Sequence, residues 1–173
     1  MKEIYLAGGC FWGTEHFIGL LHGVKETEVG YANSIVQNPD YRLVCTGTTE
    51  SAETVRVVYE EMEITLPFLL EMFFKTIDPT SLNKQGNDVG TQYRTGIYYT
   101  DAADESVVVA AFKKLQSRND RPLQIEYGKL QSFYPAEEYH QDYLINNPRG
   151  YCHINRELMA LAAKAKDPNA HKP

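Results

Sequence analysis

Residues 6–13 read LAGGCFWG, and this stretch decides the fold because it joins a predicted strand to a predicted helix. Before it, polar and apolar side chains alternate over residues 3–6, as in a strand with one buried face. After it, apolar residues recur at helical spacing up to Gly23, which marks the predicted end of the helix. Cys10 therefore stands at the first turn of the predicted helix.

The position of Cys10 predicts a reactive thiol. Unpaired backbone N–H groups and the positive end of the helix dipole favour an anion at a helix N-terminus. This position can lower the pKa of a thiol from about 8.5. Phe11 and Trp12 place two large aromatic surfaces beside the sulfur, which suits a small substrate with an apolar tail. The alternative is an inert cysteine buried in the corner between strand and helix, because free cysteines are commonly buried.

The pattern of the whole chain predicts an α+β fold in one catalytic domain, residues 1–173. The first six elements follow the order β-α-β-β-α-β, typical of a ferredoxin-like core with a mixed or antiparallel sheet. Extra helices and a loop-rich C-terminal part, residues 129–173, are expected around it. The further predicted elements are strands over 27–31, 53–59, 96–100 and 123–127, a helical turn near 41–45, helices from Thr65 to Asp78, after Asp101, over 135–143 and after Asn155, and a long polar loop over 79–94.

Composition excludes several classes of function. The formal net charge of −6 and the absence of a basic cluster argue against nucleic-acid binding. No apolar run approaches the roughly 20 residues that span a bilayer, and no secretory signal is visible at the start. Three widely spaced cysteines do not form a structural disulfide framework. A cytoplasmic location with reduced thiols is expected.

Glu53 is the second candidate for chemistry. Strand alternation places it on the same face as Val55 and Val57, so that an acid shares a face with apolar neighbours. Burial raises the pKa of a carboxyl group, and a protonated glutamic acid is what a general acid needs near neutral pH. The alternative is a solvated residue just before the strand.

Several motifs resemble one family. Gly9-Cys10-Phe11-Trp12-Gly13 resembles the active-site signature of the A-type peptide methionine sulfoxide reductases. The resemblance covers residues 2–155, and it implies an α+β fold and the reduction of methionine S-sulfoxide, free or in proteins, without a cofactor or metal. The matching segments that follow in order are Asn38-Pro39-Asp40-Tyr41, Val44-Cys45-Thr46-Gly47, Ala52-Glu53, Gln85-Gly86-Asn87-Asp88, Gly90-Thr91-Gln92-Tyr93-Arg94 and Gly150-Tyr151-Cys152.

The resemblance also implies roles for the sulfoxide site. In it, Glu53 donates a proton to the sulfoxide oxygen, which makes the sulfur electrophilic enough for attack by Cys10. Tyr41 and Tyr93 donate hydrogen bonds to the same oxygen, where charge develops as the S–O bond breaks. Asp88 helps to orient the site.

Further roles concern the substrate's methyl group and the recycling of the thiol. Phe11 and Trp12 form an apolar wall for the methyl group, and core packing is the alternative for both. Cys152 resolves a Cys10 sulfenic acid to a Cys10–Cys152 disulfide, which a thioredoxin-type partner then reduces. A monomer is expected.

The same residues also allow other interpretations. The same cysteine pair could switch a partner interaction as a redox sensor, although a sensor thiol needs no proton donor such as Glu53. A thiol peroxidase fits the aromatic wall less well, and His140, His153 and Cys152 match no structural zinc spacing. The family usually has Gly-His before Ala52-Glu53, where this chain has Glu50-Ser51. A second acid there would either raise the pKa of Glu53 further or point outward. Cys45 has no assigned role.

Overall fold

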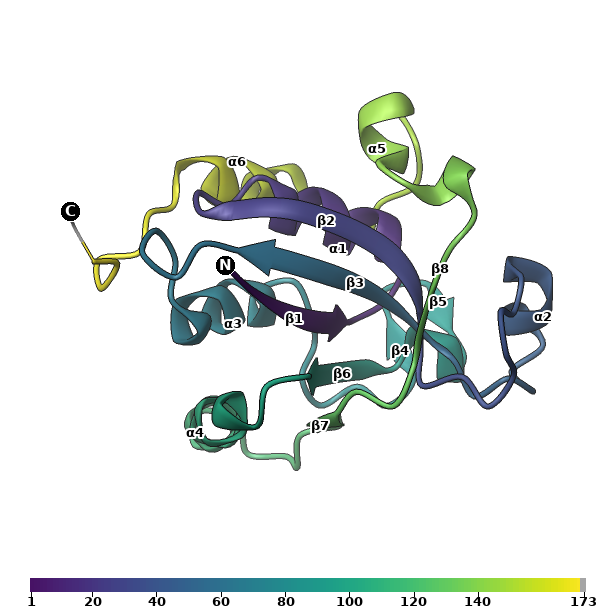
Figure 1. Cartoon of the computed structure of the whole chain (residues 1–173), viewed down its shortest axis with the longest axis horizontal. Coiled ribbons are helices and arrows are strands. Elements are labelled where there is room, and N and C mark those ends of the chain that lie inside the picture. Colours follow the sequence, from purple (N-terminus) through teal and green to yellow (C-terminus); the bar gives the residue numbers. More distant parts are fainter. Residues whose placement is uncertain (172–173) are drawn as a thin grey trace.

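The computed structural model describes residues 1–171, and its centre is one twisted sheet with the strand order β7-β6-β1-β3-β2-β8 (Figure 1). The strands of this sheet are β1 (Lys2–Ala7), β2 (Val24–Ala32), β3 (Ala52–Tyr59), β6 (Thr95–Tyr99), β7 (Ile125–Lys129) and β8 (Phe133–Pro135). The helices are α1 (Phe11–Gly19), α2 (Tyr41–Cys45), α3 (Leu66–Phe74), α4 (Glu105–Gln116), α5 (Tyr143–Asn146) and α6 (Arg156–Lys164). A small hairpin, β4 (Lys84–Gln85) with β5 (Asp88–Val89), and three 3-10 turns, η1 (Thr91–Tyr93), η2 (Ala102–Asp104) and η3 (Glu138–His140), complete the chain.

The central part confirms the predicted ferredoxin-like order. β1 pairs antiparallel with both β3 and β6, and β2 pairs antiparallel with β3. The four core strands therefore lie in the order β6-β1-β3-β2, with α1 after β1 and α3 after β3. Two strands extend this core: β7 pairs parallel with β6, and β8 pairs antiparallel with β2.

The two faces of the sheet are covered differently. Apolar residues of the strands pack with those of α1, α3, α4 and α6 in the main core, and α6 contacts α1 (Figure 1). The opposite face carries a smaller cluster that includes Tyr5 and Tyr98, with Leu130 and Phe133 packed against it. Alternation in β1 explains the split, because Ile4 and Leu6 face the helices and Tyr5 faces away. The first predicted helix thus packs on the sheet with Cys10 at its entry.

Side-chain caps define the starts of three helices, and those at Thr65 and Asn155 agree with the starts that the sequence predicts. The side chains of Asp40, Thr65 and Asn155 each accept a hydrogen bond from a backbone N–H in the first turn of α2, α3 and α6. Asp167, beyond α6, accepts from both the backbone N–H (2.7 Å) and the hydroxyl (2.6 Å) of Thr65. The chain after Cys152 is therefore fastened to the start of α3.

Some predicted elements are wrong in type or extent. Residues 135–143 do not form a helix: the segment leaves β8, makes the short turn η3 and enters α5 only at Tyr143. The fifth predicted strand corresponds to β7, which lies outside the four-stranded core and starts at Ile125, two residues later than predicted. The predicted loop 79–94 contains the β4–β5 hairpin and η1, and α3 ends at Phe74, before Asp78. Distant pairing partners determine the structure of these segments. For example, β8 forms as a strand because it pairs with β2, which is far away in the sequence.

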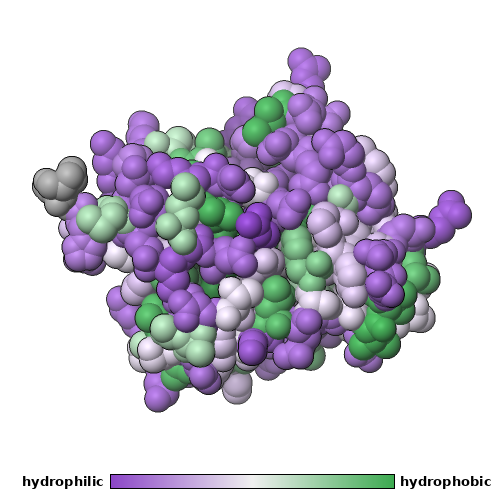
Figure 2. All heavy atoms as spheres, viewed as in Figure 1, coloured by the Kyte–Doolittle hydropathy of each residue, from purple (hydrophilic) through white to green (hydrophobic). Residues whose placement is uncertain are grey.

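The surface is mostly polar. In the view of Figure 2, hydrophilic residues cover most of this face, and apolar residues show as separate small groups between them. Within residues 1–171, no helix combines the length and the apolar character that crossing a membrane requires.

Candidate active site

Cys10 lies at the corner where β1 passes into α1. It is the N-cap residue of α1, has extended backbone angles (φ −62°, ψ 126°) and is 7% exposed. Gly9 before it has φ +82°, a left-handed conformation that glycine adopts without strain, and its N–H donates to the carbonyl of Tyr93 at 3.2 Å. Gly9 therefore allows the sharp turn that brings the start of α1 next to the η1 segment.

The predicted lowering of the Cys10 pKa is wrong. Burial raises the pKa of the thiol well above its ordinary value, and the nearby Glu53 carboxylate raises it further. A hydrogen bond from the backbone N–H of Trp12 acts in the opposite direction but is the weaker effect. Desolvation of a charge in the core outweighs the dipole of a short helix. In the unliganded protein Cys10 is a neutral thiol.

Glu53 confirms the predicted placement of an acid among apolar neighbours. It lies on β3 between buried strand residues and is 1% exposed. One carboxyl oxygen, Oε1, accepts a hydrogen bond from the backbone N–H of Phe11 at 3.3 Å, and the other has no partner among the described residues. Burial raises the pKa of Glu53 to about 8, and the charge of Asp88 adds to this effect. The carboxyl group is therefore mainly protonated at neutral pH.

Three further predicted residues come from separate elements around this pair. Tyr41 is the first residue of α2, and Tyr93 closes η1. Burial raises the pKa of both phenols, with an added effect of the Glu53 charge, so both remain hydrogen-bond donors. Asp88 lies on β5 and accepts a hydrogen bond from the hydroxyl of Tyr151 at 3.0 Å.

Trp12 and Phe11 have different surroundings. Phe11 is 1% exposed and packs in the core against Tyr31, so its side chain lies behind the site. Trp12 is only half-buried, and its ring stacks on Tyr143 with centroids 3.7 Å apart and planes 11° apart. Its indole N–H donates to Nδ1 of His140 at 3.0 Å.

His140 is the centre of an aromatic cluster. Its ring lies between those of Phe11, Trp12, Tyr41 and Tyr139, at centroid distances of 4.2–5.7 Å. Burial lowers the pKa of His140, so the imidazole is neutral and can accept the Trp12 hydrogen bond. The cluster joins the start of α1 to α2 across the η3 segment.

Cys152 lies against the first turn of α1. A Cβ atom built on Gly13 would stand 2.9 Å from the Cys152 sulfur, so the glycine leaves the space that the thiol occupies. Gly13 follows Cys10 by three residues, which places both on the same side of α1. All three cysteines are free thiols in this structure. Tyr151, just before Cys152, is the residue that reaches Asp88.

The departures from the family pattern do not reach the buried acid. Glu50 is exposed and has a left-handed backbone (φ +57°), and its carbonyl accepts a hydrogen bond from Arg94 at 2.8 Å. Ser51 is buried and shares a 2.7 Å hydrogen bond with Thr49. Glu50 therefore points outward, and the left-handed backbone explains why glycine suits this position. Cys45 is exposed on α2, close to Tyr41.

Sequence reasoning missed the residues that hold Trp12. From the sequence, His140 is a candidate only for a metal site, and no pattern marks Tyr143. An indole that is half-buried usually finds an acceptor for its N–H. That signal predicts a partner for Trp12 but cannot place it at His140, which is 128 residues away in the sequence.

A buried thiol beside a neutral carboxyl group and two phenols, on a ferredoxin-like core, defines the class of thiol-based enzymes. The family model described as peptide methionine sulfoxide reductase matches residues 2–171, and the chain belongs to this family. It is thus an oxidoreductase that reduces methionine sulfoxide with thiols.

Named relatives agree with this assignment. The chain is 56% identical to the peptide methionine sulfoxide reductase MsrA of Mycoplasma genitalium over 154 residues, 89% of this chain and 98% of that protein. It is 54% identical to the MsrA of Clostridium botulinum, over 90% of this chain and 99% of that protein.

Solved structures show the same fold. The reduced form of Mxr1 from Saccharomyces cerevisiae has a TM-score of 0.84 at 38% identity, covering 89% of this chain and 91% of that one. Methionine sulfoxide reductase A of Corynebacterium diphtheriae has a TM-score of 0.79 at 37% identity, covering 87% and 77%. Mxr1 in complex with Trx2 is also similar, with a TM-score of 0.58 at 26% identity over 82% and 84%.

Proposed function

We propose that this protein reduces methionine S-sulfoxide, free or in proteins, through a Cys10 sulfenic acid and a Cys10–Cys152 disulfide. The observation that carries the proposal is the neutral carboxyl group of Glu53, whose pKa burial raises to about 8 beside the Cys10 end of α1. A neutral acid can give its proton to an oxygen that gains charge during the reaction. The choice of the S epimer rests on the family resemblance.

The first step exchanges oxygen between two sulfurs. The Cys10 sulfur attacks the sulfoxide sulfur while Glu53 donates a proton to the sulfoxide oxygen and then takes up the proton of the Cys10 thiol. The oxygen moves to Cys10, so that the sulfide leaves as methionine and Cys10 is oxidised to a sulfenic acid. Tyr41 and Tyr93, both neutral phenols, donate hydrogen bonds toward the same oxygen. Asp88 orients this side of the site.

The second step converts the sulfenic acid into a disulfide that a reductant can cleave. The Cys152 thiol attacks the Cys10 sulfenic acid, which releases water and forms the disulfide. The contact between Cys152 and Gly13 on the first turn of α1 supports this pairing. A thioredoxin-type dithiol then reduces the disulfide, as the Mxr1 complex with Trx2 suggests for this chain.

Trp12 is the wall for the substrate's methyl group in this proposal. It is half-buried and held by Tyr143 and His140, whereas Phe11 supports the site from the core. We infer that the chain acts as a single catalytic domain, residues 1–173, whose C-terminal part from residue 129 supplies Cys152. The monomeric state and the cytoplasmic location stay predictions.

The Cys152→Ser variant tests the cycle. It should release about one methionine per enzyme in a single turnover and then stop as a sulfenic acid that dimedone traps. Dithiothreitol should restore turnover because it is small, whereas thioredoxin should support little. The matched control is Cys45→Ser, which alters an exposed thiol and should keep thioredoxin-supported turnover. Wild-type turnover of Cys152→Ser with thioredoxin would exclude Cys152 as the resolving residue. Assays with each sulfoxide epimer test the stereochemistry.

A further inference from the structure

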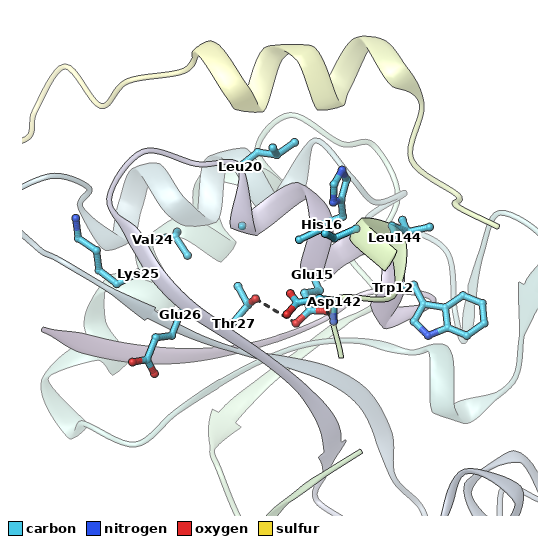
Figure 3. A pocket seen from close by; sticks show the side chains of 12 residues that line it. Trp12, Glu15, His16, Leu20, Val24, Lys25, Glu26, Thr27, Asp142 and Leu144 are labelled. Carbon is cyan, nitrogen blue, oxygen red and sulfur yellow. Dashed lines mark hydrogen bonds between the residues drawn. The ribbon is translucent and has the colours of Figure 1, made fainter. Parts of the chain in front are cut away.

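Glu15 is a buried acid that the proposed reaction does not use. It lies on α1 and is 3% exposed, beside a cavity of about 290 Å³ between α1, β2 and the segment around Asp142 (Figure 3). Its Oε1 accepts a hydrogen bond from the backbone N–H of Asp142 at 2.8 Å. Its Oε2 accepts one from the hydroxyl of Thr27 on β2 at 3.1 Å, drawn as a dashed line in Figure 3. One carboxyl group therefore joins three separate segments.

The Asp142 end of this link carries the residues that hold Trp12. Asp142 has a left-handed backbone (φ 50°) and stands directly before α5, two positions after His140 and one before Tyr143. Tyr143 stacks on the indole, and His140 accepts its N–H. The hydrogen bond to Glu15 thus fastens the backbone between the two side chains that contact Trp12.

Trp12 and Glu15 are related by helical spacing. They are three residues apart on α1, so both reach the same neighbouring segment. The adjacent Gln141 fastens this segment to β2, through hydrogen bonds of 2.9 Å each with the N–H and the carbonyl of Val29. Glu15 supplies the corresponding link to α1, the helix that carries Trp12 itself. Loss of this link would let the segment stay on the sheet edge while the contacts to the indole loosen.

We propose that Glu15 is a positioning residue for substrate binding, because it holds the segment of His140 and Tyr143 against Trp12. The orientation of the indole is then set before the substrate arrives. The effect on substrate binding rests on the proposed function, in which Trp12 contacts the methyl group. The effect on the orientation of the indole is independent of the proposed function.

Trp12 is the only tryptophan in the chain, so its fluorescence reports on this contact directly. The purified reduced protein is compared with Glu15→Ala, Glu15→Gln and Thr27→Val by emission spectrum, iodide quenching and far-UV circular dichroism. KM and kcat for methionine sulfoxide are measured with dithiothreitol. The matched control is His16→Ala, which changes the next residue of α1 at the same cavity.

Glu15→Ala should shift the emission to longer wavelength, increase quenching and raise KM about tenfold with little change in kcat. Glu15→Gln should restore both readouts, because its amide can accept from Asp142 and donate to Thr27. Thr27→Val should give a smaller change in the same direction, and His16→Ala should give none. An emission spectrum and KM like the wild type in a folded Glu15→Ala variant would overturn the proposal.

If Glu15→Ala does not fold, Thr27→Val decides: an unchanged spectrum there would also overturn the proposal. The fluorescence arm separates this inference from the proposed function. If the wild-type protein had no reductase activity, the proposed function would be refuted, and the spectra would still show whether Glu15 holds the indole. A change of kcat alone, with the spectrum and KM unchanged, would count against a positioning role.

Discussion

The neutral state of Glu53 can be tested through the stability of the protein. Burial raises the pKa of this carboxyl group from 4.5 to about 8 in the folded chain. Between these two pH values the unfolded chain has lost the proton and the folded chain keeps it, so stability falls as the pH rises. The contribution is complete below about pH 4.5 and is lost as the pH passes through about 8.

The size of the effect follows from the shift. Between about pH 4.5 and pH 8, each pH unit lowers the free energy of unfolding by about 1.4 kcal/mol. From pH 6 to pH 8 the free energy of unfolding should therefore fall by roughly 2 kcal/mol on account of Glu53. The Glu53→Gln variant has the same shape without a titrating proton, so this part of the decrease should disappear.

The assay is urea denaturation of both proteins at pH 6, 7 and 8 with a reductant present. The difference in unfolding free energy should move in favour of Glu53→Gln by roughly 2 kcal/mol across this range. Glu15, whose pKa burial raises to about 7, is present in both proteins and cancels in the difference. Parallel pH profiles would refute the reasoning, because Glu53 would then be ionised at neutral pH. In the reductase assay, Glu53→Gln should slow the single turnover by about 10²–10⁴-fold.

Three further substitutions follow from the site. Cys10→Ser should abolish turnover with every reductant, and appreciable remaining activity in a methionine-release assay would mean that another residue attacks the sulfoxide. Gly13→Ala should slow thioredoxin-supported turnover about 10- to 100-fold while the single turnover persists, because a Cβ there stands 2.9 Å from the sulfur of Cys152. Rates of thioredoxin-supported turnover that are equal in the variant and the wild type, in rapid-quench measurements, would contradict this packing. Glu50→Gly should raise the unfolding free energy by about 1 kcal/mol, since it relieves the backbone strain of a glutamate in the left-handed conformation. Activity should stay unchanged. A lower midpoint of urea denaturation would show that the backbone there is not strained.

The sequence was sufficient where short-range patterns decide the structure. Alternation in residues 53–59 allows Glu53 on the apolar face of β3, the family resemblance favours this over a solvated position, and the structure buries it there. Polar residues at helix starts predict where α3 and α6 begin, and Thr65 and Asn155 form the caps there. Such signals act within a few residues, so they need no knowledge of the rest of the chain.

Tertiary structure decided the properties that depend on distant neighbours. The position of Cys10 at a helix start predicts a lowered thiol pKa, but the core around it and the Glu53 charge raise that pKa. Glu50 could not be oriented from its spacing to Glu53, and only the left-handed turn directs it outward. The sequence wrongly predicts a helix in the segment after β8. The hydrogen-bond partners that set its true conformation, on β2 and α1, lie more than 100 residues earlier, where local patterns carry no information. The sequence by itself determined which residues could carry chemistry, and packing determined their charge states and contacts, because desolvation depends on everything that surrounds a group.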